Sequence, residues 1–444
     1  MQSRNHLAAV VLLFVFAVAN VDDVNRVAEH NVNNNPISIS VTPRAASGNT
    51  SYMPLVGAFV GGDANPNNPA DSCDNFCSMG RTVNDLGLSD RGGFDMLNDS
   101  GTGGASWHSI TSQLPWASDT NDIGGNSLAL GDLNFIKSRD KRAIVTSLYM
   151  FPEDLGQSYT YNGMTTSTCP FDPYQTDQPD RYNDDYVCMM EGVNGAFNSE
   201  WQSLGKSIVK DNLNTSQLIL RIGWECGGNW MPWSAYVAGE ANYAKYYQQI
   251  VQSVRDGISL AGQTPQVKFA WDCGTGVDLG DSKHPDSNYS SAALPGYPNN
   301  PNLYVDYLDF DPYDGGNGGF GITQGDWTTT TVGPPCQQNN LSTCRQGSLS
   351  WWSTYAGQHN MYLGFSEWGT HTNDAHYIQE VYDFIYAQSG GNYVNRVAYA
   401  AYEEHNATSE GGYDFSLDNQ SAALSKYKSL FGSPSNAPQG VLPY

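Results

Sequence analysis

Basic residues are scarce in this sequence. Its 444 residues include 21 Lys and Arg against 45 Asp and Glu, which gives a formal net charge of −24. Such an excess of negative charge repels the phosphate groups of nucleic acids and of anionic membranes. We therefore expect neither nucleic acid nor a membrane as a partner.

Long hydrophobic runs are confined to the first twenty residues. Met1–Asn20 contains Arg4, an apolar run from Leu7 to Val18 and a small-residue cleavage site, which is the pattern of a secretory signal peptide. The run is too short to anchor a protein in a bilayer. We expect residues 1–19 to be a signal peptide and the protein to be secreted and extracellular.

The motifs of nucleotide-dependent and cofactor-dependent enzymes are missing as well. The sequence has no phosphate loop, no dinucleotide fingerprint and no Ser/His/Asp order. Its glycine-rich run at 315–319 lacks the Lys-Ser/Thr pair that a phosphate loop needs. We expect no cofactor and no metal ion.

Cysteines, in contrast, are present in an even number. Eight cysteines in a chain that is expected to be exported predict disulfides. Zinc is the alternative for Cys73 and Cys77, although no second pair or histidine lies at ligand spacing. The simplest connectivity joins neighbours: Cys73–Cys77, Cys169–Cys188, Cys226–Cys273 and Cys336–Cys344. Asn-x-Ser/Thr sequences, which are glycan acceptors in a eukaryotic host, lie at Asn49, Asn98, Asn214, Asn288, Asn340, Asn406 and Asn419.

Three segments follow the signal peptide. Residues 20–52 are polar and Asn-rich without apolar periodicity, which is typical of a disordered leader. Residues 53–432 are expected to form one domain, and residues 433–444 a tail. Within the domain, Gly156–Met190 has no clear period and is expected to be an irregular insertion. We expect the protein to be a monomer.

Eight short apolar runs in that domain predict β-strands, and helical periodicity between several of them predicts α-helices. Eight strands interleaved with helices indicate an α/β fold, a single (β/α)8 TIM barrel, whose active site lies at the C-terminal ends of the strands. The runs are Met53–Gly62, Gly92–Asp99, Ala143–Phe151, Gln217–Gly223, Val267–Gly274, Tyr307–Gly315, Met361–Gly369 and Arg396–Tyr402.

Two of these strands end in a glutamate beside tryptophan. Strand four leads to Glu225 in QLILRIGWECGGNWMPWS, and strand seven leads to Glu367 in MYLGFSEWG. One such glutamate alone is more often a rim residue that caps the next turn. Two of them suit glycoside hydrolysis, which needs two carboxyl groups across a sugar bound on aromatic faces. The tryptophans beside them are Trp224, Trp230, Trp233 and Trp368.

Alternation along a strand places further polar groups near these acids. Arg221 shares a face with Glu225, and its guanidinium favours the ionised form of the nearer acid while tryptophan packing raises the pKa of the other. Asp311 and Tyr313 share a face on the sixth strand. Asp311 either binds sugar hydroxyls or belongs to a turn around the following proline. Glu403, with the Glu-His pair after it, is expected to be a solvated strand end.

These motifs resemble glycoside hydrolase family 26, the β-mannanase type, over about Met53 to Phe431. The resemblance rests on LRIGWECGGNWMPWS, FSEWG, PGYPNNPNLYVDYLDFDPYD and LVGAFVGG. It implies a retaining (β/α)8 hydrolase, with Glu225 as the acid/base and Glu367 as the nucleophile. The resemblance also matches Arg221 to the family arginine on strand four, Tyr313 to a tyrosine that contacts the nucleophile, and Asn229 and Trp230 to the segment after the acid/base. With these residues, we expect Trp224, Trp233, Asp311 and Trp368 at the substrate.

The chain departs from the family at one position that matters. Typical β-mannanases have histidine before the acid/base, whereas this chain has Trp224. The expected substrate is therefore a β-linked polysaccharide, of the endo-β-1,4-mannanase (mannan endo-1,4-β-mannosidase) type first, with β-1,3-xylan and β-glucan as alternatives. A retaining mechanism requires carboxyl groups about 5–5.5 Å apart. The alternative function is a catalytically inactive barrel that binds glycan or serves as a matrix protein.

Overall fold

The computed structural model describes part of the chain, and all of that part belongs to one compact unit, Gly48–Tyr444. None of its helices is long and apolar enough to cross a membrane. The predicted signal peptide, the 20–52 leader, Cys73, Cys77, Asn229 and Trp230 lie outside the described residues. These residues are 54–59, 94–97, 144–148, 150, 154–169, 181–210, 212–228, 231–273, 293–314, 331–389, 392–403, 414–432 and 442.

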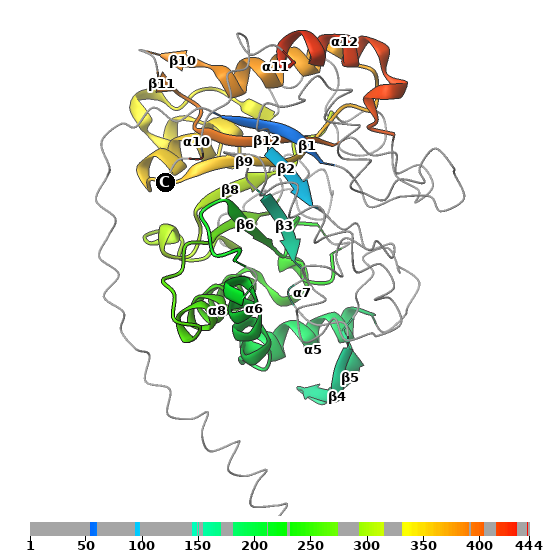
Figure 1. The fold of residues 1–444 in the computed structure, drawn as a ribbon, viewed down its shortest axis with the longest axis vertical. Coiled ribbons are helices and arrows are strands. Elements are labelled where there is room, and N and C mark those ends of the chain that lie inside the picture. Colours follow the sequence, from blue (N-terminus) through cyan, green and yellow to red (C-terminus); the bar gives the residue numbers. More distant parts are fainter. Residues whose placement is uncertain are drawn as a thin grey trace, which may run out of the picture. The chain divides into compact units, whose positions relative to one another are not determined.

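Eight parallel strands form one curled sheet, and each lies where the sequence predicts a strand (Figure 1). Each strand pairs with its neighbours in the order β1-β12-β9-β8-β7-β6-β3-β2, and β1 pairs with both β12 and β2. Because all eight run in the same direction, their C-terminal ends meet at one edge. Their bounds are β1 Leu55–Phe59, β2 Phe94–Leu97, β3 Ile144–Leu148, β6 Leu218–Ile222, β7 Lys268–Asp272, β8 Tyr307–Phe310, β9 Tyr362–Trp368 and β12 Val397–Glu403.

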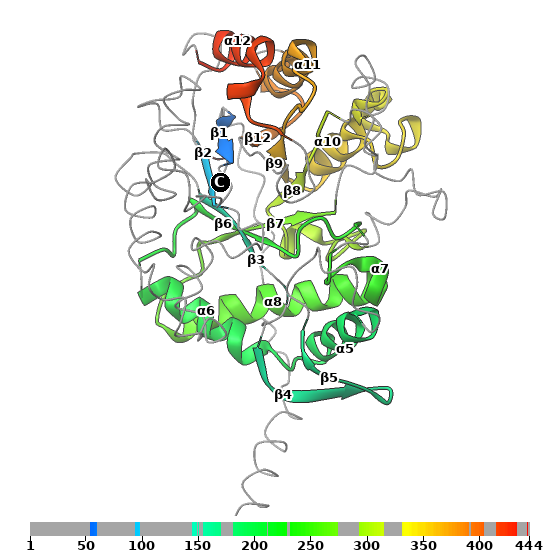
Figure 2. The same ribbon diagram turned by 90° about the vertical axis from the view of Figure 1, so that its right-hand side faces the viewer.

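Helices cover the sheet on two sides (Figure 2). On one side α6 and α8 pack so closely that a Cβ on Gly205 or Gly257 would overlap the backbone of the other helix. On the other side α11 packs against α12. The bounds are α5 Arg181–Val193, α6 Asn198–Lys210, α7 Ala235–Ala238, α8 Glu240–Leu260, α10 Leu349–Gln358, α11 Ala375–Tyr386 and α12 Ser421–Leu430. The described part of the β7–β8 connection contains only a 3-10 turn, η2 Pro301–Leu303; the others are η4 Gln337–Asn339, η5 Leu341–Thr343 and η7 Leu417–Asn419.

The segment predicted to be an irregular insertion is ordered in its described part. Strands β4 (Asp154–Tyr161) and β5 (Met164–Thr168) form an antiparallel hairpin, and α5 follows. The hairpin turns at Asn162 and Gly163, both with positive φ, which is the two-residue turn that matches strand twist. The Asn-Gly pair was therefore a hairpin signal that our prediction missed. A second short hairpin joins β10 (Gln388–Ser389) and β11 (Asn392–Tyr393).

Two further expectations concern the disulfides and the glycan acceptors. Three of the four expected disulfides are present: Cys169–Cys188, Cys226–Cys273 and Cys336–Cys344. The expectation that Asn214 is a glycan acceptor is wrong, because this residue is only 8% exposed. Its amide donates to Gln263 Oε1 at 2.8 Å and to the Thr264 carbonyl at 2.9 Å. A glycan on that nitrogen would replace one of the two donated hydrogens and break that hydrogen bond.

Three tyrosines of α8 donate hydrogen bonds to backbone carbonyls in or just after three neighbouring strands. Tyr243 donates to the Gly223 carbonyl at 2.8 Å, Tyr247 donates to the Ala270 carbonyl at 2.8 Å, and Tyr246 donates to the Met150 carbonyl. All three side chains are fully buried. A buried backbone carbonyl without a donor destabilises a fold by roughly 1–3 kcal/mol, and each tyrosine hydroxyl supplies such a donor. The helix thereby fixes the backbone from which the candidate site is built.

Candidate active site

Arg221, on β6, is the centre of the candidate site. Its guanidinium is fully buried and contacts carboxylates from three neighbouring strands or the loops that follow them. On one side it donates from Nε to Asp272 Oδ2 at 3.0 Å and forms an ion pair with Asp309 at 3.6 Å. On the other side it donates to Asp311 and to Glu367. These acids come from distant parts of the sequence, and the parallel sheet brings them around one cation.

Glu367 is held by two donors, one at each oxygen of its carboxylate. Arg221 donates to Oε1, and the Tyr313 hydroxyl donates to Oε2 at 2.6 Å. The side chain is 9% exposed. Because a donor binds each oxygen, the carboxyl group of Glu367 is held with a fixed plane. The arrangement suits a nucleophile.

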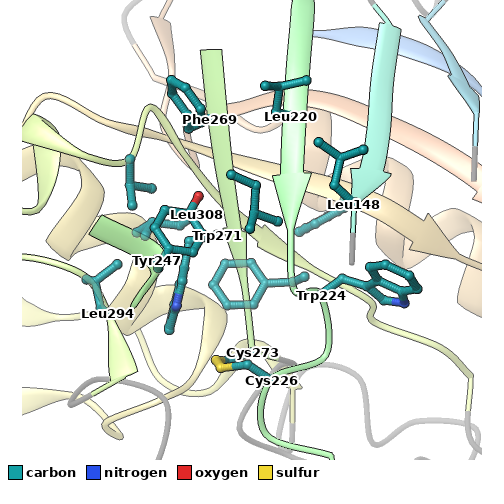
Figure 3. Close-up of a cluster of buried hydrophobic side chains, with 14 of the residues drawn as sticks. Leu148, Leu220, Trp224, Cys226, Tyr247, Phe269, Trp271, Cys273, Leu294 and Leu308 are labelled. Atoms are coloured by element: carbon teal, nitrogen blue, oxygen red, sulfur yellow. A yellow bond between two sulfur atoms is a disulfide. The ribbon is translucent and has the colours of Figure 1, made fainter. Parts of the chain in front are cut away.

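Glu225 occupies the turn that follows β6, in a strained backbone conformation. Its φ is +50°, a region that residues with a Cβ rarely adopt, and such strain collects at functional sites. The turn is anchored next to it, where the Cys226 amide donates to the Asp272 carbonyl at 3.2 Å and Cys226 is bonded to Cys273. The two cysteines lie at the edge of a buried cluster (Figure 3), with Cα atoms 4.3 Å apart. The expected Cys226–Cys273 pairing is confirmed, and it ties the Glu225 turn to β7.

Gly227 shows why this turn needs glycine. A Cβ at this position would lie 2.7 Å from the Cys273 carbonyl oxygen, which is too close for any real side chain. The close approach of the turn to β7 therefore depends on Gly227, as well as on the disulfide.

Two of the tryptophans predicted at the substrate are core residues. Trp233 is fully buried, donates from its indole to the Trp224 carbonyl at 2.7 Å and packs on the Trp224 ring at 4.6 Å. Trp368 is also fully buried and packs against Tyr427 of α12 and Phe431, which follows that helix. Adjacent strand residues face opposite ways, so Glu367 faces the interior of the sheet while Trp368 faces the helices. Neither ring can hold a sugar in this conformation.

Trp224 is nearly buried as well. Its exposed fraction is 4%, and it lies beside the end of β6 within the hydrophobic cluster (Figure 3). With so little of its surface exposed, Trp224 offers a substrate little contact area. The two remaining predicted contacts, Asn229 and Trp230, lie outside the described residues.

Asp309 of β8 is a fully buried acid beneath the site. Its Oδ1 accepts from the amides of Phe310 and Ser366 at 3.1 and 2.9 Å. Its Oδ2 accepts from the hydroxyls of Ser366 and Tyr399. Burial raises the pKa of Asp309 to about 7, against the opposite effects of Arg221 and of these hydroxyls. Asp309 thus joins three strands beneath the site.

Asp311 brings the two glutamates into one electrostatic environment. Burial raises its pKa well above the usual range, Arg221 opposes this, and the charges of Asp272, Glu367 and Glu225 add to the rise. Arg221 lies in β6 and Glu367 in β9, while Glu225 and Asp311 follow the C-terminal ends of β6 and β8.

Glu403 is a residue that our sequence interpretation missed. As the last residue of β12 it is only 7% exposed, so its assignment to a solvated strand end is wrong. Burial, then Glu367 and then Glu403 raise the pKa of Tyr313, which places Glu403 beside this phenol. The signal was available, because Glu403 lies four residues after the inward-facing Tyr399 and strand faces repeat every two residues.

The described residues contain no group of three or more His, Cys, Asp or Glu side chains that fits a metal ion. The acids at the site have Arg221 as their shared partner instead. A cation at the same place would be repelled by the guanidinium.

Comparisons with known proteins gave only distant structural similarity. No protein-family model and no curated protein matches the chain. Among solved structures, GH26C from a Muricauda species has a TM-score of 0.49 and 13% identity, over 88% of this chain and 87% of that one. The catalytic domain of a GH26 endo-β-1,4-mannanase from a Bacillus species has a TM-score of 0.48 and 14% identity, over 86% of each chain. A modular endo-β-1,4-mannanase from Cellulomonas fimi has a TM-score of 0.46 and 15% identity, over 82% of this chain and 70% of that one. Similarities this distant indicate nothing about the reaction.

Proposed function

We propose that this protein is a retaining glycoside hydrolase with a (β/α)8 barrel, acting on a β-linked polysaccharide outside the cell. The observation that carries the proposal is the pair of hydrogen bonds that holds the Glu367 carboxyl group. One oxygen is bound by Arg221 and the other by Tyr313, at the edge of the sheet that also carries Glu225. Three disulfides in the described part suit an oxidising compartment and hence secretion.

The proposed reaction proceeds in two displacements. Glu367 attacks the anomeric carbon and forms a glycosyl ester, while Glu225 protonates the leaving oxygen. Glu225 then takes a proton from water, which attacks the same carbon and releases Glu367 as a carboxylate. Arg221 and Tyr313 hold the plane of the Glu367 carboxylate through both steps, so that its attacking oxygen needs no reorientation.

The charges of the described site favour a neutral sugar. A uronic acid would need a cation for its carboxylate, and the buried cation of the described site, Arg221, already contacts four acids. A further negative charge there would be repelled. The sequence motifs around Glu225 and Glu367 support β-1,4-mannan as the first substrate to test, with β-1,3-xylan and β-glucan next.

The test is release of reducing sugar from a panel of purified polysaccharides. The panel contains β-mannan, β-1,3-xylan, β-glucan and the uronate polymers alginate and pectate, and Glu367→Ala is the control protein. We expect wild type, and not the variant, to cleave at least one neutral β-linked polymer and neither uronate polymer. No release from any neutral polymer would reject the proposal.

A glycan-binding barrel without activity is the second candidate function. It is favoured by one observation, the complete burial of Trp233 and Trp368, which removes two expected sugar platforms from the catalytic site. Affinity electrophoresis in gels containing the same polysaccharides separates the two functions. Retarded migration without any sugar release would support the binding protein.

A further inference from the structure

Four acids surround the single guanidinium of Arg221. The contacting side chains of Asp272 and Asp309 are fully buried, and those of Asp311 and Glu367 are 3% and 9% exposed. If all four were ionised, the group would hold an excess of three negative charges away from water. Buried charges that lack a partner shift their pKa and become neutral. At least one of these acids therefore holds a proton in the folded protein.

Hydrogen bonds identify which acid is suited to hold it. Glu367 accepts at its two oxygens from Arg221 and Tyr313, and Asp309 accepts at its two oxygens from two amides and two hydroxyls. Neither oxygen of Asp272 is among the buried atoms without a hydrogen-bond partner. In Asp311, Oδ2 accepts from Arg221, whereas Oδ1 is buried and has no hydrogen-bond partner among the described residues. An ionised oxygen without a donor is costly to bury, but a protonated one is itself a donor that needs only an acceptor.

We propose that Asp311 is protonated on Oδ1 in the resting protein and donates this hydrogen bond to a hydroxyl of the sugar bound against Glu367. The second half rests on the proposed function; the first half does not. The hydroxyl oxygen supplies the acceptor that the protein itself leaves out, so Oδ1 becomes satisfied when substrate binds. A protonated Asp311 also leaves the charge of Arg221 to its other contacts, among them Asp272 and Glu367.

The electrostatic surroundings agree with this assignment. Burial raises the pKa of Asp311 well above the usual range of a carboxyl group, and Arg221 is the group that opposes this rise. The charged or titratable groups that act on Asp311 are Arg221 of β6, Glu225 after β6, Asp272 of β7, Glu367 of β9 and Tyr313 after β8. All of them except Arg221 and Tyr313 are acids, so ionising Asp311 would add repulsion from several directions.

The first test needs no substrate. The protein is labelled with ¹³C at aspartate carboxyl carbons, and the resonance missing from Asp311→Asn is assigned to Asp311. We expect it to stay at the position of a protonated carboxyl from about pH 4 to about pH 7. A resonance that moves to the ionised position near pH 4, as for an ordinary aspartate, would overturn the proposal.

The second test uses activity on whichever polysaccharide the wild-type protein cleaves. Asp311→Asn keeps an acceptor for Arg221 and a donor toward the sugar, so we expect it to lower kcat/KM less than Asp311→Ala does. Asp311→Ala removes both and should lower kcat/KM by about 10- to 100-fold. Equal losses in both variants would show that an ionised Asp311 is needed, and would overturn the donor role.

The two tests also separate this inference from the proposed function. If wild type cleaves no polysaccharide, the proposed function fails, while the carboxyl resonance still decides whether Asp311 is protonated. Thermal unfolding of both variants is measured alongside, and the resonance in Asp311→Asn suffices if the alanine variant does not fold.

Discussion

The Tyr313 hydroxyl donates to Oε2 of Glu367 at 2.6 Å. The bond joins the segment after β8 to the end of β9, and it is short and partly shielded from water. Hydrogen bonds of this kind to an ionised group are roughly twice as strong as neutral ones. Tyr313 therefore fixes the carboxylate that we assign as the nucleophile, and its ring rests on Phe415 at 4.7 Å.

The first prediction is that Tyr313→Phe lowers kcat by about 10- to 100-fold, while its loss of stability is no larger than that of another buried tyrosine hydroxyl. The substitution removes one charge-assisted hydrogen bond from Glu367 and leaves the ring on Phe415 in place. Steady-state kinetics on the cleaved polysaccharide, together with thermal unfolding, measures both effects.

Tyr247→Phe is the matched control for this prediction. It also deletes a buried tyrosine hydroxyl, which donates to the Ala270 carbonyl at 2.8 Å, away from Glu367. We expect it to lower stability by roughly 1–3 kcal/mol, since a buried carbonyl loses its donor, and to leave kcat nearly unchanged. Equal losses of kcat in both variants would show that Tyr313 acts through the fold alone.

The second prediction separates the roles of the two glutamates. Glu367→Ala should abolish turnover of every substrate, because no glycosyl ester can form. Glu225→Ala should still form the ester from dinitrophenyl glycosides, whose leaving group needs no proton. Added azide should then restore turnover and give a glycosyl azide of retained configuration, identified by proton NMR.

The contrary outcome of that experiment is specific. If azide rescues Glu367→Ala with a product of retained configuration and Glu225→Ala with an inverted one, the two roles have to be exchanged. If neither variant is rescued, a double displacement through these residues is excluded. A crystal structure gives an independent check, since the retaining mechanism also requires carboxyl groups about 5–5.5 Å apart.

The strands of the fold were predictable because their signal is local. Apolar runs such as Leu218–Ile222 in β6 are buried along their whole length, as strands of a covered parallel sheet are. The positions of Glu225 and Glu367 at the ends of two such strands then followed from counting strands. The hairpin turn at Asn162 was equally local and was simply overlooked.

The contacts that define the site were beyond the sequence because they join distant residues. Arg221 is 146 residues away from Glu367 and 90 from Asp311, and no periodicity in the sequence encodes such a pairing. The positive φ of Glu225 is likewise set by the tertiary fold. Trp368 was misassigned for another reason: its neighbour in the sequence was taken as its neighbour in the site, although strand residues alternate between faces.

The third prediction concerns the Cys226–Cys273 disulfide. Replacing both cysteines with alanine should lower stability by about 4 kcal/mol from the chain entropy of the closed loop, and should also lower kcat because the Glu225 turn is released from β7. The Cys336–Cys344 disulfide closes a shorter loop. Replacing both of its cysteines with alanine should therefore lower stability by only about 2.6 kcal/mol and should not affect kcat. Chemical unfolding and steady-state kinetics on the two double variants measure both quantities. If kcat is unchanged in both double variants, the Cys226–Cys273 disulfide is not needed to position Glu225.

The last prediction concerns Asp309 and the dependence of stability on pH. Burial raises the pKa of Asp309 to about 7 in the folded protein, whereas an unfolded aspartate titrates near about 3.9. Between these values the folded state binds more protons than the unfolded state, so the free energy of unfolding falls as pH rises from about 4 to about 7. The contribution of Asp309 to this fall is on the order of 4 kcal/mol.

Asp309→Asn should remove that contribution, because an amide does not titrate. Its oxygen can accept from the amides of Phe310 and Ser366, and the hydroxyls of Ser366 and Tyr399 can rotate to accept from its nitrogen. Urea unfolding at a series of pH values should therefore show the variant gaining on wild type as pH rises from about 4 to about 7. The same substitution at the exposed Asp383 of α11 is the control, for which we expect a profile parallel to wild type. A parallel profile for Asp309→Asn would mean that Asp309 is already ionised at low pH, because its four donors and Arg221 together outweigh its burial.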